Sequence, residues 1–288
     1  MKVNIVPKAL SGVINAPASK SYAHRLIIGA FLSDTQVEIH GVGASRDVTA
    51  TVTALTAMGG TLRHEGDVVY VDKRRAVNGE ITVNCLESGS TIRFLYPIAC
   101  ALGQSANFTG SERLMQRPMG EIVECVKGHG VNATDHHVDG ALTSGTFVID
   151  AGVSSQHVTG LMFALPLLDG DSKIVLTGKV VSRGYLDITV DVLKKFGIVI
   201  NAVEDGYIVP GNQRYVASGA LCAEGDWSGS AFMLCAGALD GPVTVRGLNA
   251  SSAQGDAKIL NVLDLIGAKI SVNGDAVTVS RGDLKAIS

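Results

Sequence analysis

The chain has 288 residues, of which 46% are hydrophobic and only 18% are charged, so it must bury a large core and is neither disordered nor fibrous. The formal net charge is −3 with no block of like charges, which disfavours nucleic-acid binding. The longest uncharged apolar runs, at Leu161–Leu168 and Ala231–Leu239, are too short to cross a bilayer, and residues 1–10 contain no secretory apolar region. Five cysteines without a C-x-x-C pair predict reduced thiols and a cytoplasmic location.

A short sequence pattern, which predicts a helix, then a glycine and then an alternating strand, recurs along the chain. Its glycines are Gly59, Gly130, Gly197 and Gly267, so the spacing between successive copies is nearly constant. Apolar residues at helical spacing precede each glycine, and glycine after such a pattern is typical of a left-handed helix end. The helical patterns cover Thr51–Met58, Ile122–Lys127, Ile188–Phe196 and Ile259–Ile266.

Each copy of this pattern continues with an alternating strand, a turn and a second strand. The turns are predicted at Glu65-Gly66-Asp67, Asp139-Gly140, Glu204-Asp205-Gly206 and Asn273-Gly274-Asp275. Units of about 70 residues are longer than solenoid repeats. The sequence therefore predicts an α/β protein built from repeated βαβαββ modules.

The first segment with chemistry is Pro17–Arg25, which leads into the apolar run Leu26–Leu32. Ser19 or Ser21 can cap the following helix, whose N-terminal N–H groups favour an anion. Lys20 adds a point charge, and Arg25 adds a planar donor suited to carboxylate or phosphate. The alternative, an ordinary capped helix with surface cations, stays open at this point.

Two later segments repeat the theme in the second module. At Glu87–Leu95, small polar residues open a helix that carries Arg93, and Gly89 permits close approach of a ligand to the backbone. At Gly110–Met119, Arg113 and Arg117 occupy a loop closed by Pro118. A plain N-cap and ordinary ion pairs are the structural alternatives for these two segments.

Two segments of the third module offer hydroxyl groups. Ser154-Ser155-Gln156 opens the apolar helix His157–Leu168 and makes a neutral cradle for phosphate. Ser182–Asp187 supplies a hydroxyl and the aromatic face of Tyr185. Capping and core packing are the alternatives. Equivalent loops of repeated modules converge on one face, so the gathered cations predict a pocket for a small polyanion: Lys20, Arg25, Arg93, Arg113, Arg117 and Arg183.

The segment Asp135–Asp139, with His136 and His137, resembles a metal cluster. Adjacent histidines in a turn point to different faces, and no second ligand set is evident, so no metal is expected. Because no phosphate-binding loop or dinucleotide-binding glycine pattern occurs, no cofactor is predicted either.

Taken together, these segments resemble the 5-enolpyruvylshikimate-3-phosphate synthase family, or 3-phosphoshikimate 1-carboxyvinyltransferases. The resemblance runs through the whole chain in order, and it is carried by Ser19-Lys20-Ser21 with Arg25, Ser88-Gly89-Ser90 with Arg93, Arg113-Leu114 with Arg117-Pro118-Met119, Ser154-Ser155-Gln156, Ser182 with Tyr185-Leu186-Asp187, Glu224–Ser228 and Gln254-Gly255-Asp256. The chain departs from the family at Ser90, where Thr is common, at Glu87, where Asn is usual, and at Phe94, where some members have Pro.

The resemblance implies an enolpyruvyl-transferase fold of two domains, each of three modules. Residues 13–222 would form the three-module domain that binds shikimate 3-phosphate. Residues 1–12 and 223–288 would form part of the second domain, with one module. Since the repeat occurs four times and the family needs six modules, the chain is expected to lack the C-terminal third, including an acid/base aspartate.

The resemblance also implies roles for single residues. Lys20 would be catalytic and bridge both substrates. The residues implied for shikimate 3-phosphate are Lys20, Ser21, Arg25, Ser154, Ser155, Gln156, Ser182 and Tyr185. Those implied for phosphoenolpyruvate are Lys20, Gly89, Arg117 and Gln156.

The implied activity is transfer of an enolpyruvyl group from phosphoenolpyruvate to the 5-hydroxyl of shikimate 3-phosphate. The expected partners are these two anions and a missing C-terminal fragment, with no nucleic acid or membrane and a monomer at full length. The form present here is expected to bind without turnover. The alternatives are a UDP-N-acetylglucosamine enolpyruvyl transferase, disfavoured because residues 110–117 lack that family's cysteine, and a non-catalytic anion-binding fragment.

Overall fold

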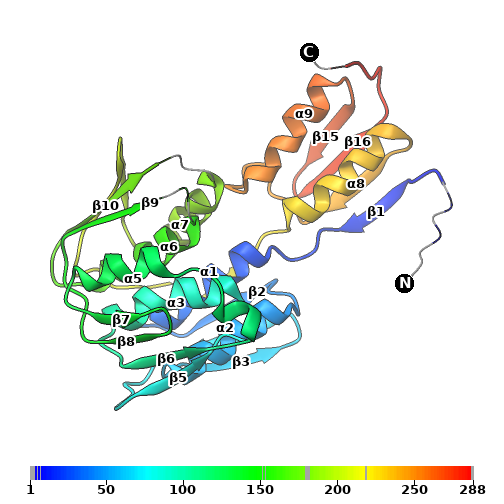
Figure 1. Cartoon of the computed structure of the whole chain (residues 1–288). Coiled ribbons are helices and arrows are strands. Elements are labelled where there is room, and N and C mark those ends of the chain that lie inside the picture. The colour runs from blue at the N-terminus through cyan, green and yellow to red at the C-terminus, as the bar shows by residue number, and fades with distance from the viewer. Residues whose placement is uncertain are drawn as a thin grey trace. The chain divides into compact units, whose positions relative to one another are not determined.

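The computed structural model describes residues 4, 6, 8–150, 152, 154–178, 182–217 and 219–286. The chain divides into two compact units (Figure 1). Unit 1 comprises Met1–Ser19 and Glu224–Ser288, and unit 2 comprises Lys20–Ala223.

Unit 2 contains two modules that are continuous in sequence. The first consists of β5 (Ile81–Asn84), α3 (Gly89–Ala101), β6 (Ala106–Thr109), α5 (Gly120–Lys127), β7 (Asn132–Thr134) and β8 (His137–Asp139), with the one-turn helix α4 (Glu112–Met115) before α5. The second consists of β9 (Thr146–Asp150), α6 (Ser155–Ala164), the 3-10 turn η1 (Leu165–Leu167), β10 (Ser172–Thr177), α7 (Arg183–Lys195), β11 (Asn201–Val203) and β12 (Gly206–Val209). Their sheets have the strand orders β5-β6-β8-β7 and β11-β12-β10-β9. In both sheets the two strands that come first in the sequence, β5 with β6 and β9 with β10, are parallel. The other neighbouring strands are antiparallel.

The other two modules exchange their first strands. Unit 2 also contains α1 (Lys20–Leu32), β2 (Val37–His40), α2 (Arg46–Ala57), β3 (Thr61–Glu65), β4 (Val68–Asp72) and β13 (Ala220–Cys222). Unit 1 contains β1 (Gly12–Asn15), α8 (Trp227–Leu239), β14 (Val243–Arg246), the 3-10 turn η2 (Gly255–Lys258), α9 (Ile259–Leu265), β15 (Lys269–Asn273) and β16 (Ala276–Ser280). The late strand β13 pairs in parallel with β2, and the early strand β1 pairs in parallel with β14. The same βαβαββ pattern thus holds in all four sheets of the described residues, as the sequence repeat predicted.

Both boundaries of unit 2 differ from the predicted 13–222, the first by seven residues and the second by one. The three-module domain was expected to begin at Val13, but Val13 pairs with Thr244 of unit 1. The change of unit falls between Ser19 and Lys20, and the return falls between Ala223 and Glu224. The pairing of a short strand with a partner near the other end of the chain is set by the tertiary fold and leaves no local sequence signal.

The predicted glycine stops are present after α2, α5, α7 and α9, the second long helix of each module. Gly59, Gly130, Gly197 and Gly267 have φ values of 97°, 88°, 74° and 88°, the left-handed region that favours glycine. The turn at Gly66 and the turn at Gly274 also lie where the sequence placed them, each between two antiparallel strands.

The turn predicted at Asp139-Gly140 is wrong. The hairpin turns at Asp135-His136 instead, because Thr134 pairs with His137. Gly140 follows the second strand, and a Cβ there would lie 3.0 Å from the carbonyl oxygen of Gly130. Glycine is therefore needed at this position for close backbone approach and not for the reversal of the chain.

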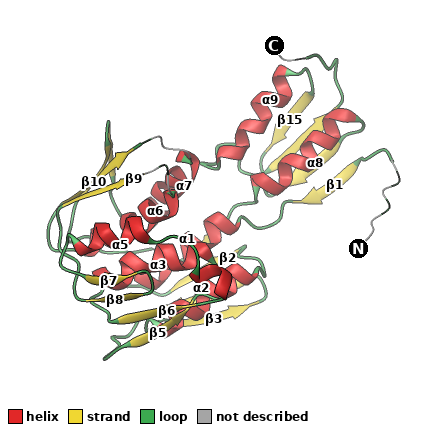
Figure 2. Cartoon of the chain, in the orientation of Figure 1, coloured by secondary structure: helices red, strands yellow, loops and turns green. Residues whose placement is uncertain are grey.

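The first helices of the unit 2 modules form its core. Residues Tyr22–Leu32 of α1 are all buried, and so are nearly all residues of α3 and residues 157–164 of α6. Figure 2 shows these helices within unit 2, with strands toward its outside. A helix that is apolar on every side must be buried on every side, as the run Leu26–Leu32 shows. Unit 1 has its own core around Trp227, Leu234 and Val245. Within the described part of the chain, no helix has the length and apolarity to span a membrane.

Candidate functional site

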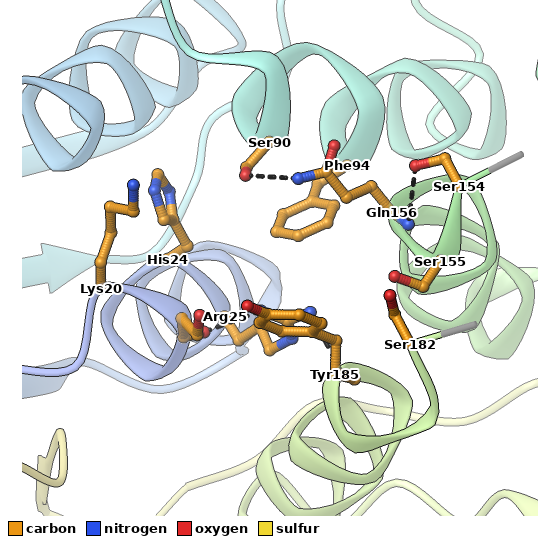
Figure 3. A pocket seen from close by; sticks show the side chains of 11 residues that line it. Lys20, His24, Arg25, Ser90, Phe94, Ser154, Ser155, Gln156, Ser182 and Tyr185 are labelled. Carbon is orange, nitrogen blue, oxygen red and sulfur yellow. Dashed lines mark hydrogen bonds between the residues drawn. The ribbon is translucent and has the colours of Figure 1, made fainter. Parts of the chain in front are cut away.

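The N-terminal ends of four helices in unit 2 line one cavity of about 350 Å³ (Figure 3). Its lining residues come from α1, α3, α6 and α7, and they are Lys20, Ser21, His24, Arg25, Ser90, Phe94, Ser154, Ser155, Gln156, Ser182 and Tyr185. As far as the chain is described, this lining contains two permanent cations and no carboxylate. Helix N-termini add positive potential, so the cavity favours an anion.

Arg25 forms the buried floor of this cavity and is only 2% exposed. Its Nε donates to Thr189 Oγ1 at 2.8 Å, one Nη donates to the Ser21 carbonyl at 2.8 Å, and the other donates to Thr159 and to the Tyr185 carbonyl. The guanidinium also lies 4.9 Å from the centre of the Phe94 ring. Burial lowers the pKa of Arg25 to about 10, because its neighbours are neutral acceptors. These bonds use four of its five N–H groups, so within the described residues one donor is left for a ligand.

Lys20 and His24 lie one helical turn apart on α1, as their spacing of four residues requires. Lys20 Nζ lies 2.8 Å from the Asp47 carboxylate at the start of α2, with the two side chains 53% and 32% exposed. His24 is buried and lies edge-on to Phe94. Burial lowers its pKa to about 3, so the imidazole is neutral at physiological pH.

Three serines gather on the opposite wall of the cavity. Ser154 caps α6 and accepts from the Gln156 N–H at 3.2 Å. Ser155 follows it in the first turn, and Figure 3 shows its hydroxyl facing that of Ser182. Ser182 precedes α7 and makes no side-chain cap on that helix, so among the described residues its hydroxyl is open to a ligand. The capping interpretation therefore holds for Ser154, and all three hydroxyls still line the cavity.

Gln156 bridges α6 to α3 at the upper rim. Its Nε2 donates to Ser90 Oγ at 2.8 Å, and its Oε1 accepts from Arg93 at 2.9 Å. Burial, and then the nearby Arg117 cation, lower the pKa of Arg93. Two guanidinium groups close enough to repel each other make a second place where an anion would be stabilised.

Gly89 and Arg117 meet beside this bridge but outside the lining of the cavity. A Cβ at Gly89 would lie 2.2 Å from Arg117 Nη1, so only glycine lets the guanidinium reach the first turn of α3. This is the close approach that the sequence predicted at Gly89, although the observed neighbour is a side chain of the protein.

The prediction that six cations gather at one pocket is correct only for Lys20 and Arg25, which line the cavity; Arg93 and Arg117 lie beside it. Arg183 lies two residues before Tyr185 on α7, about 200° around the helix at 100° per residue. Tyr185 faces the cavity, and Arg183 lines a separate one with Glu204 and Asp205. Arg113 lies on the exposed one-turn helix α4 and not in a loop.

The histidine pair of the β7–β8 hairpin contacts two different neighbours. His136 Nε2 contacts the Met115 carbonyl at 3.0 Å, and His137 Nδ1 contacts Asn107 at 3.0 Å. No group of three His, Cys, Asp or Glu side chains suited to a metal occurs in the described ranges.

Sequence reasoning missed His24, Asp47 and the threonines beneath Arg25. The spacing of His24 from Lys20 is the signal that could have revealed it. Thr159 and Thr189 lie on helices far from Arg25 in sequence, so only the tertiary fold brings them to the guanidinium.

The fold is that of the enolpyruvyl transferases. The structure of an EPSP synthase from Acinetobacter baumannii matches with a TM-score of 0.78 and 19% identity, covering 97% of this chain and 66% of that one. The enolpyruvyl transferase NikO from Streptomyces tendae matches with a TM-score of 0.68 and 18% identity, covering 95% of this chain and 66% of that one.

Sequence comparison narrows this class to one family. The family described as EPSP synthase (3-phosphoshikimate 1-carboxyvinyltransferase) matches residues 6–288. The 3-phosphoshikimate 1-carboxyvinyltransferase of Clostridium novyi (strain NT) is 37% identical over 99% of this chain and 69% of its own length. That of Clostridium beijerinckii is 36% identical over 93% of this chain and 65% of its own length. The chain belongs to the EPSP synthase family, a family of transferases, and spans about two thirds of the length of these relatives.

Proposed function

We propose that the cavity of unit 2 binds shikimate 3-phosphate, the acceptor in enolpyruvyl transfer from phosphoenolpyruvate. The observation that carries the proposal is the lining itself. One wall offers hydroxyls and the N-terminus of α6, the floor offers a buried guanidinium, and the rim offers Lys20.

The phosphate is assigned to Ser154, Ser155 and Ser182. A phosphate carries several strong acceptor oxygens and no obligatory donor at neutral pH, so hydroxyls and backbone N–H groups suit it. Neutral donors also let the phosphate bind without a neighbouring cation drawing it away from the wall.

The carboxylate of the ligand is assigned to Arg25 and Ser21 on the opposite side. A bound carboxylate would supply the negative charge that the buried guanidinium lacks. Gln156 and the exposed ring of Tyr185 lie between the two ends, where the shikimate ring would pack.

Phosphoenolpyruvate is assigned to the neighbouring rim, with Gly89, Arg117, Lys20 and Gln156. Arg93 and Arg117 are mutually repelling cations there, which a second anion would relieve. Lys20 stands at the edge of both positions and is proposed as the catalytic residue that bridges the two substrates.

The reaction adds the 5-hydroxyl of shikimate 3-phosphate to the enolpyruvyl carbon while the methylene carbon gains a proton, and it then eliminates phosphate as the new methyl group loses a proton. A group must remove the hydroxyl proton, and another must protonate the methylene carbon. Among the described residues no Asp or Glu lines the cavity, and His24 is neutral and buried. We therefore propose that unit 2 binds the acceptor but that the chain as it stands does not turn it over.

We also propose that the protein acts in the cytoplasm and is a monomer at full length, and we assign it no metal or cofactor. Neither nucleic acid nor a membrane is proposed as a partner. A C-terminal companion fragment would be the partner that completes the cleft.

Calorimetric titration of the purified chain with shikimate 3-phosphate tests the binding proposal. Saturable binding is expected, with shikimate lacking the phosphate binding at least tenfold more weakly. Ser155→Ala and Ser182→Ala should each raise the dissociation constant about tenfold, since a hydrogen bond to a charged group contributes about 1.5 kcal/mol or more. Exposed Ser251→Ala in unit 1 is the matched control and should bind like the wild type.

Absence of heat with shikimate 3-phosphate, or equal affinity for shikimate, would contradict the assignment. Phosphate release from a mixture of both substrates tests turnover separately. Release at enzymatic rates would overturn the proposal of binding without turnover and leave the binding site intact.

A further inference from the structure

A chain of buried polar side chains runs beneath Lys20 and joins the first three helices of unit 2. His24 Nδ1 on α1 lies 2.6 Å from Thr51 Oγ1 on α2, and Thr51 Oγ1 lies 2.8 Å from Thr91 Oγ1 on α3. Thr91 donates to Ser88 Oγ at 2.8 Å. All four side chains are at most 2% exposed, so water does not complete their hydrogen bonds. Next to this chain lies the Asp47 carboxylate: burial raises its pKa, and nearby groups, Lys20 and Ser88 among them, lower it by more, to a net decrease. Lys20 Nζ lies 2.8 Å from this carboxylate.

The bond from Thr91 to Ser88 fixes the direction of the other bonds in this hydrogen-bond chain. Each hydroxyl has a single proton to donate, and Thr91 gives its proton to Ser88. Thr51 must therefore donate to Thr91. Thr51 has no proton left, so it can only accept from His24.

The same argument fixes the tautomer of His24. Its proton lies on Nδ1, and Nε2 keeps a lone pair. Nε2 is buried and has no hydrogen-bond partner among the described residues, which suits an acceptor better than an N–H group. Lys20 and Arg25 on α1 repel a second proton, and Asp47 on α2 attracts one, but burial outweighs them all and keeps the ring neutral.

We propose that His24, Thr51, Thr91 and Ser88 are positioning residues that orient Asp47, and through it Lys20, by a one-directional chain of hydrogen bonds. This inference deepens the proposed function, because it concerns the lysine assigned to both substrates. Lys20 is half exposed on a flexible stem, and in the described structure its side chain is held by the ion pair with Asp47. In this proposal Ser88, the last hydroxyl of the hydrogen-bond chain, steadies the nearby carboxylate, and the carboxylate gives the ammonium a fixed place at the rim.

The hydrogen-bond chain also explains why Thr51 and Thr91 carry buried hydroxyls, which the ion pair of Lys20 and Asp47 does not require. Thr51 and Thr91 are buried between helices of two different modules, where Val or Ala would pack without polar cost. Their hydroxyls place α1, α2 and α3 in one register, so the position of Lys20 depends on the neighbouring module as well as its own.

Long-range proton–nitrogen NMR of the chain labelled with ¹⁵N-histidine tests the direction of the bonds without any ligand. The His24 signals are assigned by their loss in His24→Asn. Wild type is expected to show a neutral ring protonated on Nδ1, the minor form of free histidine. A ring protonated on Nε2, or on both nitrogens at neutral pH, would overturn the proposal.

Thr91→Val tests whether the direction comes from the far end of the chain. Without Thr91 the Thr51 proton is released toward His24, and the ring should change to the Nε2–H tautomer. Thr91→Ser should restore Nδ1–H, and the exposed Thr56→Val on α2 should leave it unchanged. If Thr91→Val does not fold, Asp47→Ala removes the anchoring carboxylate at a partly exposed position and should yield a mixture of tautomers. An unchanged tautomer in the folded variant refutes the one-directional chain.

Titration with shikimate 3-phosphate then tests the link to Lys20. Thr91→Val and Asp47→Ala should raise the dissociation constant about three- to tenfold, and Thr91→Ser should restore it. Unchanged affinity despite a changed tautomer would refute the positioning role. A wild type with the predicted tautomer but no affinity would instead refute the proposed function and leave the hydrogen-bond chain standing.

Discussion

Replacing Arg25 with Met should stabilise unit 2 while removing its affinity for the ligand. Arg25 is a buried cation without a carboxylate partner in the described structure, and burial lowers its pKa to about 10. One pKa unit corresponds to about 1.4 kcal/mol, so holding this cation costs the folded chain about 3 kcal/mol at neutral pH.

Loss of the Arg25 hydrogen bonds in the variant should cancel only part of the stability gained by removing the buried charge. Thr159 and Thr189 also bond to each other at 3.0 Å, and Thr189 donates to the Tyr185 carbonyl at 2.8 Å. These acceptors therefore keep partners in Arg25→Met, and methionine fills the space of the stem. We expect the free energy of unfolding to rise by about 1–2 kcal/mol, because a buried charge is replaced by an apolar group of similar length.

Urea unfolding followed by circular dichroism measures this change. Trp227 is the only tryptophan and lies in unit 1, so its fluorescence transition serves as an internal reference that Arg25→Met should not shift. The same variant should bind shikimate 3-phosphate at least tenfold more weakly, because it cannot donate to the carboxylate. A loss of stability above about 2 kcal/mol would show that the bonds of Arg25 outweigh its burial, and would refute the reasoning.

Three further substitutions test other contacts. Gly89→Ala should displace Arg117, whose Nη1 would lie 2.2 Å from the new Cβ, and should weaken phosphoenolpyruvate binding about tenfold by calorimetry with little change in stability. Gly120→Ala at the start of α5 is its control, since a Cβ there meets nothing within 4 Å. Gly29→Ala should lower the free energy of unfolding by about 2–4 kcal/mol in urea, because its Cβ would lie 2.3 Å from the buried Phe196 ring; a stable variant would show that α1 and the ring can separate easily. His157→Leu should stabilise the chain, because both ring nitrogens of buried His157 lack partners in the described structure. The gain should be larger at pH 5 than at pH 8. Burial lowers the pKa of His157 to about 4, so the wild type loses stability as the pH falls from about 6.5 toward 4. Equal gains at the two pH values would contradict the histidine's neutrality in the folded state.

Local rules predicted the parts of the fold that depend on backbone conformation. Gly59 and its three counterparts adopt the left-handed helix end because glycine alone does so without strain. The same rule failed at Gly140, where an Asp-Gly pair suggests a turn but glycine serves a close approach to Gly130. Glycine after aspartate suits both a turn and a close backbone contact, and at Gly140 only the position of the neighbouring strand determines which of the two occurs.

The residues of the cavity could be predicted as a set, because helix N-termini of repeated modules converge. Their orientation could not. Arg183 and Tyr185 belong to the same predicted segment, yet helical rotation sends them to different cavities. Asp47 and Thr51 contact α1 only through the packing of α1 on α2, which the pattern of either helix does not specify.

The exchanged strands have a consequence for synthesis on the ribosome. Gly12 of β1 pairs with Val243, so the first strand has no partner until translation has passed that valine. At about 5–20 residues per second, this delay is on the order of 10–50 s. Both β1 and β13 are outermost in their sheets, so the nascent chain can build the inner strands first and add each outer one by docking. The nascent chain therefore carries β1 without its partner strand throughout the synthesis of unit 2, and an unpaired strand of this kind can pair with another chain unless it is protected.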